Sequence, residues 1–364
     1  MKKNKIAVYA ICKNEEKFAA RWAKSMSEAD EIVVLDTGSE DRSAEILSSF
    51  PKVRVFREKI SPWRFDTARN RALEKVSADA DWCVSTDLDE LFCEGWRDKL
   101  EAAVSDAVKL IRYRYTWSFS ADGTEDVVFW INKIHRRSEF VWRHPVHEVI
   151  CYTGEGEPPD AFAQGLELYH YPDSTKPRGQ YLSLLELSVR EAPEDDRNMH
   201  YLGREYMFRG CWDECIETLR RHLELPSARW ADERSASMRY IAAAYIKKAQ
   251  PEQARGWLLR AAAEAPYLRE PWLDLAAFCF DLGEWHGVIW AAQKALEIKE
   301  RPKTYISSGA CWGEQLYDLL SLAYYYTGSA KEALKYSEEA IKKAPGDGRL
   351  LKNREFFLKA VRCD

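Results

Sequence analysis

The sequence predicts an α/β domain followed by an all-α domain of helical repeats. Three observations predict this division. Short β-rich runs alternate with helical stretches over residues 1–175, the strand pattern disappears by about residue 194, and a helical repeat continues from there to the end. Strands that alternate with helices form mostly parallel sheets covered on both faces. A chain of 364 residues is also longer than one small core requires. We therefore expect domains at 1–175 and 194–364, joined by a linker or helix at 176–193.

The composition limits the class of protein. Hydrophobic residues make up 46% and charged residues 31%, which excludes a disordered chain, a collagen-like fibre and a small disulfide scaffold. The net charge of -5 provides no basic field that would attract nucleic acid, and no apolar run is long enough for a membrane span. Nine cysteines without a CxxC pair, and no secretory signal, predict reduced thiols and a cytoplasmic location.

Within the first domain, β-rich and helical patterns follow one another in a regular order. Strands are predicted at residues 6–11, 31–35, 53–56 and 82–86. Helices are predicted between them, at residues 16–26, 43–49 and 68–76. Tryptophan-containing runs between residues 113 and 142 then predict longer and more antiparallel strands.

The second domain is marked by small residues at equivalent positions. Gly203, Ala242, Ala276 and Ala323 are 39, 34 and 47 residues apart. Small side chains there let two antiparallel helices approach closely, and a proline ends the second helix. The pattern resembles about four tetratricopeptide repeats, with a capping helix near residues 347–361. Such a stack implies a groove for a peptide or protein, or a homodimer through residues 300–364; a helical buttress for the first domain is the alternative.

Polar motifs follow three of the predicted strands, where open α/β sheets bind ligands. Glu15 stands in the turn after the first strand, where it either begins a helix or contacts a ligand. Asp36 ends the second strand, in position either for a ribose hydroxyl or base N–H or for capping its own turn. The first strand leads into neither GxGxxG nor GxxxxGK[ST], which disfavours a dinucleotide fold and a P-loop.

The third motif is Asp87-x-Asp89, directly after the buried strand at residues 82–86. Two carboxylates that project from a strand end are hard oxygen ligands, and these suit Mg²⁺ or Mn²⁺ bridging a diphosphate. The motif therefore predicts a metal-assisted site for a phosphorylated ligand.

Four motifs in this order resemble family 2 glycosyltransferases of the GT-A fold. They are Lys13-Asn14-Glu15-Glu16, Leu35-Asp36-Thr37-Gly38-Ser39-x-Asp41, Asp66-x-Ala68-Arg69-Asn70-x-Ala72 and Asp87-x-Asp89-Glu90. With the repeats behind them, the chain resembles a subgroup that includes enzymes glycosylating ribosomal peptides. The resemblance implies a Rossmann-like mixed sheet, a nucleotide-sugar donor, with a UDP-sugar as the expected form, and Mn²⁺ or Mg²⁺.

The resemblance also implies roles for individual residues. Those implied to line the nucleotide-sugar are Ala10, Cys12, Glu15, Asp36, Arg69 and Asp87. Asp89 is implied to hold the metal, with Asp87 and His170 beside it. One departure is Thr37, where many members carry a second acid.

A His-Glu pair, His147 and Glu148, is the candidate for the proton acceptor of the reaction. Displacement at an anomeric carbon needs a base on the acceptor, and Glu148 is the predicted base with His147 as its neighbour or a diphosphate contact. Asp126 or Glu125 is the alternative base, and a hydrogen-bonded core pair is the alternative for His147 and Glu148.

The chain contains 14 tryptophans, and Trp117, Trp130 and Trp142 are among those that fall between the acidic motif and the His-Glu pair. Trp117, Trp130 and Trp142 are therefore candidates to stack on a sugar ring.

The expected activity is metal-dependent, inverting transfer of a hexose from a UDP-sugar, by default UDP-glucose or UDP-N-acetylglucosamine. The acceptor is a peptide or protein, or alternatively a saccharide or lipid-linked molecule. A sugar-nucleotide pyrophosphorylase would need a Gly-rich loop after the first strand, which is absent. A tetratricopeptide scaffold with an inactive GT-A domain is the alternative from another class.

Overall fold

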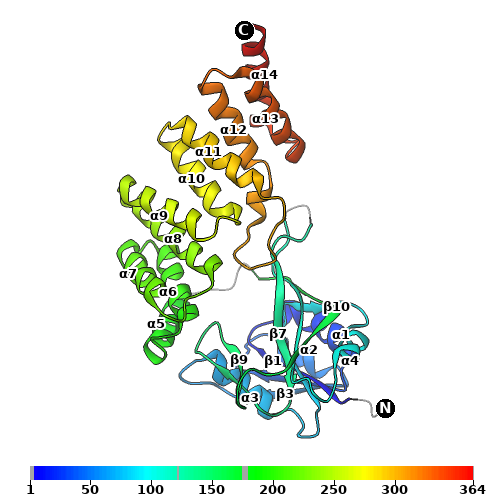
Figure 1. The fold of residues 1–364 in the computed structure, drawn as a ribbon. Coiled ribbons are helices and arrows are strands. Elements are labelled where there is room, and N and C mark those ends of the chain that lie inside the picture. Colours follow the sequence, from blue (N-terminus) through cyan, green and yellow to red (C-terminus); the bar gives the residue numbers. More distant parts are fainter. Residues whose placement is uncertain (1–3, 121–122, 174–178, 364) are drawn as a thin grey trace. The chain divides into compact units, whose positions relative to one another are not determined.

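The computed structural model describes residues 4–120, 123–173 and 179–363 (Figure 1). The chain divides into two compact units, Met1–Ser188 and Val189–Asp364. Helix α5 (Tyr181–Glu191) spans this division, and residues 176–178 of the predicted linker lie outside the described residues. Across the described residues, no helix has the length and apolar character needed to cross a membrane.

The first unit is built on an eight-stranded mixed sheet in the order β3-β2-β1-β4-β7-β6-β10-β5. The first four strands in that order are mutually parallel, whereas β7 is antiparallel to both β4 and β6. The strands of this sheet are β1 (Ile6–Cys12), β2 (Glu31–Asp36), β3 (Val53–Arg57), β4 (Trp82–Ser85), β5 (Glu90–Phe92), β6 (Leu110–Thr116), β7 (Val128–Arg136) and β10 (Asp160–His170). A separate antiparallel pair consists of β8 (Phe140–Arg143) and β9 (Val149–Tyr152).

Both faces of the central strand β1 are covered, as its continuous apolar sequence requires. On one face, Ile6 and Val8 share a buried cluster with Trp22 of α1 (Glu16–Ser25) and Trp96 of α4 (Trp96–Ala103). On the other face, Tyr9 packs in a cluster with residues of α3 (Phe65–Glu74) and β8. The remaining short helices are η1 (Met26–Glu28) and α2 (Ser43–Ser48). The four predicted strands and three predicted helices are confirmed, with ends shifted by up to three residues.

Strand register brings the ligand-binding motifs to one edge of the sheet. Cys12 pairs with Asp36 on β2, and Tyr9 pairs with Ser85 on β4, so the carboxyl ends of the three strands are neighbours. At the other side of the sheet, His170 at the end of β10 pairs with Glu90 of β5. The topology therefore gathers residues that are far apart in the sequence around the turn after β4.

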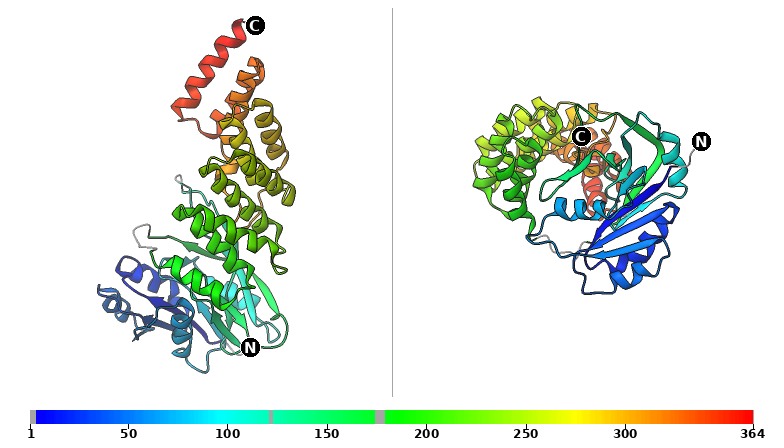
Figure 2. Two further views of the ribbon diagram at one scale, coloured as in Figure 1. Left: turned by 90° about the vertical axis from the view of Figure 1, so that its left-hand side faces the viewer. Right: turned by 90° about the horizontal axis from the view of Figure 1, so that it is seen from below.

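The second unit is a series of helix pairs, each packed on the next (Figure 2). This confirms the predicted repeats and the capping helix. The pairs are α6 (Asp196–Arg209) with α7 (Trp212–Glu224), α8 (Ala231–Lys247) with α9 (Pro251–Glu264), α10 (Arg269–Asp281) with α11 (Trp285–Glu297), and α12 (Gln315–Tyr326) with α13 (Ala330–Lys343). The series ends with α14 (Gly348–Cys363), and η2 (Gly309–Trp312) lies in the long connection that widens the last spacing.

The small residues of the repeat sit where the helices of a pair meet. Ala242, Ala276 and Ala323 are all 0% exposed. At Gly203, an added Cβ would lie 2.3 Å from Cδ2 of the fully buried Leu219 on α7. Only glycine therefore allows this approach between α6 and α7 without displacing Leu219.

Replacing Gly203 tests this packing. We expect Gly203→Ala to lower the free energy of unfolding by about 1–3 kcal/mol, because overpacking a core outweighs the better helix propensity of alanine. Gly256→Ala is the matched control: this glycine is also helical, and its added Cβ would meet nothing within 4 Å. That control should raise the free energy of unfolding by up to about 1 kcal/mol in urea titrations. Equal effects of both substitutions would contradict the packing described.

Candidate active site

The first two motifs are held together by hydrogen bonds between their turns. The backbone N–H of Asn14 donates to Ser39 Oγ at 3.0 Å, and Asn14 Oδ1 accepts from the backbone of Glu40 at 2.8 Å. The backbone N–H of Glu16 donates to Asp41 Oδ2 at 3.1 Å. The two polar turns thus form a single rim at the carboxyl ends of β1 and β2.

Asp36 is buried under this rim and caps its own turn. Its Oδ1 accepts from the backbone N–H groups of Gly38 at 3.1 Å and Ser39 at 2.8 Å. Gly38 has a φ of 116°, a conformation that favours glycine. Arg57 Nε lies 3.6 Å from the other carboxylate oxygen. The capping role considered from the sequence is therefore present, and a contact with the base or ribose stays a prediction.

Ala10 and Cys12 point into the core from the same strand end. Their side chains are 0% and 2% exposed, so a nucleotide contact by Ala10 would have to use its backbone. Burial raises the pKa of the Cys12 thiol to about 12, which leaves it protonated and unreactive at neutral pH. Glu15 precedes α1, and its backbone N–H donates to Ser43 Oγ at 2.6 Å.

A buried guanidinium, that of Arg69 on α3, connects four residues of the site. Its Nη2 donates to Asp87 Oδ1 at 2.8 Å, its Nε to Glu148 Oε1 at 2.5 Å and its Nη1 to Ser85 Oγ at 3.3 Å. The guanidinium also lies 5.0 Å from the ring centroid of Trp142. The structure thus brings together Arg69, Asp87, Glu148 and Trp142, which the sequence predicted at separate places.

Lys133 of β7 adds a second cation to this cluster. Its Nζ lies 2.9 Å from Glu90 Oε1 and 3.4 Å from Asp87 Oδ2. Glu90 also accepts from the hydroxyl of Tyr115 at 2.7 Å and from the backbone N–H of Asp87 at 2.8 Å. Burial opposes ionisation of Asp87, but the charges of Arg69 and then Lys133 outweigh it and hold the pKa of Asp87 well below its usual range.

Sequence reasoning placed Lys133 in a basic stretch suited to a phosphate-bearing ligand but assigned no individual role to Lys133, Glu90 or Tyr115. Glu90 follows the acidic motif directly, which was a signal for it. Lys133 and Tyr115 reach the cluster only because β7 pairs with β4 and β6 pairs with β7, and nothing local in the sequence indicates those pairings.

Asp89 contacts His170 of β10. The Oδ2 of Asp89 lies 3.5 Å from His170 Nε2, and His170 Nδ1 lies 2.9 Å from the carbonyl oxygen of Trp117. Because a carbonyl only accepts, Nδ1 carries a proton and Nε2 is the nitrogen directed at Asp89. Burial lowers the pKa of His170, but the hydrogen bond to Asp89 outweighs this, and the net pKa is raised.

The three candidate tryptophans have different surroundings. Trp117 is 45% exposed and stacks on His170 with ring centroids 4.4 Å apart. Trp142 is 3% exposed, and its Nε1 donates to the hydroxyl of Tyr9 at 2.7 Å. Trp130 packs edge-on against Phe162, on the face of β7 opposite to that of its neighbour Phe129. Trp117 is thus the one of the three that is both exposed and next to Asp89.

The candidate bases also separate. Glu148 is in the Arg69 cluster, whereas His147 has a φ of 52° and lies edge-on to Tyr181 with ring centroids 6.0 Å apart. Glu125 forms an ion pair with Arg114, whose Nη1 lies 2.6 Å from Glu125 Oε1. Asp126 accepts from Ser118 Oγ at 3.2 Å.

A hollow of about 650 Å³ opens beside His170. Arg21 of α1 contributes positive charge to its wall, where Lys17 is paired with Asp173 at 3.1 Å. Phe119 and Tyr171 stack there with ring centroids 5.3 Å apart. The hollow has room for a ligand beside His170, with cationic and aromatic groups for phosphate and ring contacts.

Residues 7–153 match the family model described as glycosyl transferase family 2. The first unit contains a family 2 glycosyltransferase domain. A curated relative, the lipopolysaccharide core biosynthesis glycosyltransferase LpsC of Rhizobium meliloti (strain 1021), is 28% identical over 111 residues. The aligned segment is 30% of this chain and 40% of that relative, so the similarity spans less than half of LpsC. The predicted fold class, a GT-A domain followed by helical repeats, is confirmed.

Solved structures similar to this chain include MamA and TTC0263, a thermophilic tetratricopeptide protein of Thermus thermophilus. MamA is 21% identical over 45% of this chain and 86% of its own, with a TM-score of 0.37. TTC0263 is 20% identical over 50% of this chain and 88% of its own, with a TM-score of 0.34. At such scores the helix pairs themselves, rather than these neighbours, establish the repeat architecture.

Removing the guanidinium of Arg69 tests the cluster. Arg69→Met leaves Asp87 and Glu148 without their shared cation, and losing one partner of a buried ion pair costs about 3–5 kcal/mol. Because the Asp87 side chain is 35% exposed, we expect the lower end, a loss of about 3 kcal/mol in the free energy of unfolding. Arg57→Met is the matched control, since this arginine side chain is 77% exposed and also faces an aspartate. The control should lose less than about 1 kcal/mol in urea unfolding, and a similar loss from both variants would contradict a central role for Arg69.

Proposed function

We propose that the protein is a metal-dependent glycosyltransferase that moves a hexose from a UDP-sugar to a peptide, protein or saccharide acceptor, with inversion. The observation that carries the proposal is the cluster of ionised groups around Arg69, at the carboxyl ends of strands in a family 2 domain. Ligands of open α/β sheets bind at this edge.

The charges of the cluster argue for a divalent cation. Two cations, Arg69 and Lys133, face three carboxylates, those of Asp87, Glu90 and Glu148. The protein groups alone therefore leave no surplus positive charge for a diphosphate. Mn²⁺ or Mg²⁺, when bound, would supply the charge that stabilises the departing diphosphate.

Asp89 and His170 fit such an ion. His170 presents Nε2 to Asp89 while the Trp117 carbonyl fixes its other nitrogen, and metal-binding histidines are commonly held in this way. Asp87, the third metal ligand predicted, is turned toward Arg69 and Lys133, so we assign it to the sugar or ribose.

Glu148 is the base in this proposal. Its carboxylate is held in place by Arg69 Nε and would remove the proton from the acceptor hydroxyl or thiol as the glycosidic bond forms. One base and one direct displacement at the anomeric carbon give inversion. His147, adjacent in sequence, is assigned as the neighbour of the base or as a contact of the diphosphate.

The donor and acceptor are assigned more broadly. UDP-glucose and UDP-N-acetylglucosamine are the first donors to test, with Trp117 as the platform for the sugar ring. In this proposal a peptide or protein acceptor binds the helical repeats. The alternative use of the repeats is a homodimer through residues 300–364, of which residue 364 lies outside the described residues. We place the reaction in the cytoplasm, in keeping with the cysteine usage.

Donor binding tests the metal assignment. We expect Asp89→Ala to abolish Mn²⁺-dependent binding of UDP in calorimetric titrations, because it removes the carboxylate ligand of the ion. Asp106→Ala, which changes an exposed acid of the same unit, should bind UDP as the unchanged protein does. If the Asp89→Ala variant bound UDP in the presence of Mn²⁺ as tightly as the unchanged protein does, the metal site would be removed from the proposal.

Turnover tests the base. With a set of UDP-sugars, Mn²⁺ and candidate acceptors, we expect Glu148→Gln to slow UDP release coupled to transfer by about 10²-fold or more, with UDP binding retained. Glu125→Gln should transfer at the rate of the unchanged protein, because Glu125 is occupied by Arg114. If Glu125→Gln were the slow variant, the roles would be reversed. If the unchanged protein neither binds UDP nor turns over any donor, the scaffold alternative holds.

A further inference from the structure

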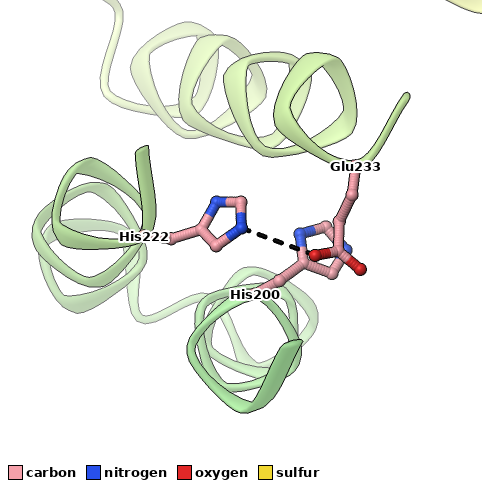
Figure 3. Close-up of side chains that lie close together, drawn as sticks. All are labelled: His200, His222 and Glu233. Atoms are coloured by element: carbon pink, nitrogen blue, oxygen red, sulfur yellow. Dashed lines mark ion pairs between the residues drawn. The ribbon is translucent and has the colours of Figure 1, made fainter. Parts of the chain in front are cut away.

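A second group of potential ligands is buried among helices of the second unit. His200 comes from α6, His222 from α7 and Glu233 from α8, and the three offer ligand atoms that all lie within 4.8 Å of one another (Figure 3). Both imidazoles are 0% exposed and Glu233 is 4% exposed. Among the described residues, this is the one group of three or more His, Cys, Asp or Glu side chains with that spacing. Nothing in the glycosyl transfer proposed above uses it.

The hydrogen bonds of the two histidines use one nitrogen of each ring and leave the other nitrogen without a hydrogen-bond partner in the part of the chain that the structure describes. Ser237 Oγ lies 2.7 Å from His200 Nδ1 and 3.0 Å from His222 Nδ1, so one hydroxyl holds both rings. The Nε2 atoms of both rings are buried, and neither has a hydrogen-bond partner among the described residues. A buried polar atom left without a partner costs about 1–3 kcal/mol, so two of them in one place call for a ligand.

Glu233 completes the group with one of its two oxygens. Its Oε2 accepts from the hydroxyl of Tyr305, while its Oε1 lies 3.5 Å from His222 Nε2, the pair joined by the dashed line in Figure 3. Ser237 and Tyr305 therefore orient the three side chains from outside, as the outer partners of metal ligands do.

The protonation states also suit a metal. Burial lowers the pKa of His200 to about 3, so its ring is neutral at pH 7. Burial opposes ionisation of Glu233, but its contacts with His222 and with the hydroxyl of Tyr305 outweigh this and lower its pKa to about 2. Arg197 and Arg204 add positive charge nearby, which weakens attraction for a cation but also keeps His200 unprotonated. Metal ions bind neutral imidazole and ionised carboxylate.

We propose that His200, His222 and Glu233 bind one divalent transition-metal ion, with Zn²⁺ as the best match. Two imidazole nitrogens and one carboxylate oxygen form an established type of zinc ligand set, with a fourth position left for water or another donor. Mg²⁺ and Ca²⁺ prefer oxygen ligands throughout, so the set disfavours both. The ion would join α6, α7 and α8, and hence the first helix pair to the second. This proposal is independent of the glycosyl transfer.

The first test uses the full chain with the substitution Asp89→Ala. This substitution removes the proposed metal site of the first unit, so that Zn²⁺ bound there does not contribute to the titration. After removal of metal with a chelator, we expect it to bind one Zn²⁺ in calorimetric titration. At a free Zn²⁺ concentration about 100 times the Kd, its midpoint of thermal unfolding should rise by about 5–10 °C. Mg²⁺ at the same concentration should leave the midpoint unchanged. Absence of Zn²⁺ binding, or a midpoint that Zn²⁺ does not shift, would overturn the proposal. This test leaves His200, His222 and Glu233 unsubstituted.

Ligand variants in the same background locate the ion. We expect His200→Gln and His222→Gln to weaken Zn²⁺ binding by more than about 100-fold, and Ser237→Ala by about 10–100-fold, the range found for outer partners. His286→Gln is the control, because His286 is an exposed histidine of the same unit, and it should bind Zn²⁺ as the Asp89→Ala protein does. Helix content from circular dichroism shows that each variant is folded. Undiminished Zn²⁺ binding by a folded variant that carries both His200→Gln and His222→Gln would place the ion elsewhere and overturn the proposal.

Discussion

The buried guanidinium of Arg69 is the interaction on which the first unit's site depends. A charge that leaves water must be paired, and Arg69 is paired by Asp87 after β4 and by Glu148 after β8. These two acids are about sixty residues apart in sequence. The same cation therefore joins the end of the parallel strands to the β8–β9 pair. Lys133 extends the network to Glu90, so that ionised groups of either sign alternate across the edge of the sheet.

This network gives the two acids of the Asp-x-Asp motif different tasks. Asp87 is neutralised by protein cations, whereas Asp89 faces His170 and remains the acid that a divalent ion could share. Two carboxylates two residues apart on an extended chain need not act together, because their neighbours differ. Trp117, which stacks on His170, is the exposed tryptophan on the Asp89 side of this division.

The order of elements in both units could be predicted from the sequence, because local signals determine it. Apolar runs marked β1 to β4, and small residues such as Gly203 and Ala242 marked the helix pairs, since packing geometry demands them. Partners across the sheet could not be predicted. Lys133 reaches Glu90 through strand pairing alone, and Trp142 turned out to be buried against Tyr9 and Arg69. His200, His222 and Glu233 carried no spacing signal, because three separate helices bring them together.

The central claim is that the edge of the sheet around Arg69 and Asp89 binds the diphosphate of a nucleotide-sugar together with a divalent cation. A crystal grown with UDP and Mn²⁺, with anomalous scattering recorded to locate manganese, tests it most directly. The account predicts a manganese peak within bonding distance of the Asp89 carboxylate and the UDP diphosphate, with the nucleotide on the rim formed by the turns after β1 and β2. Manganese and UDP bound away from Asp89, or a crystal in which neither binds, would contradict it.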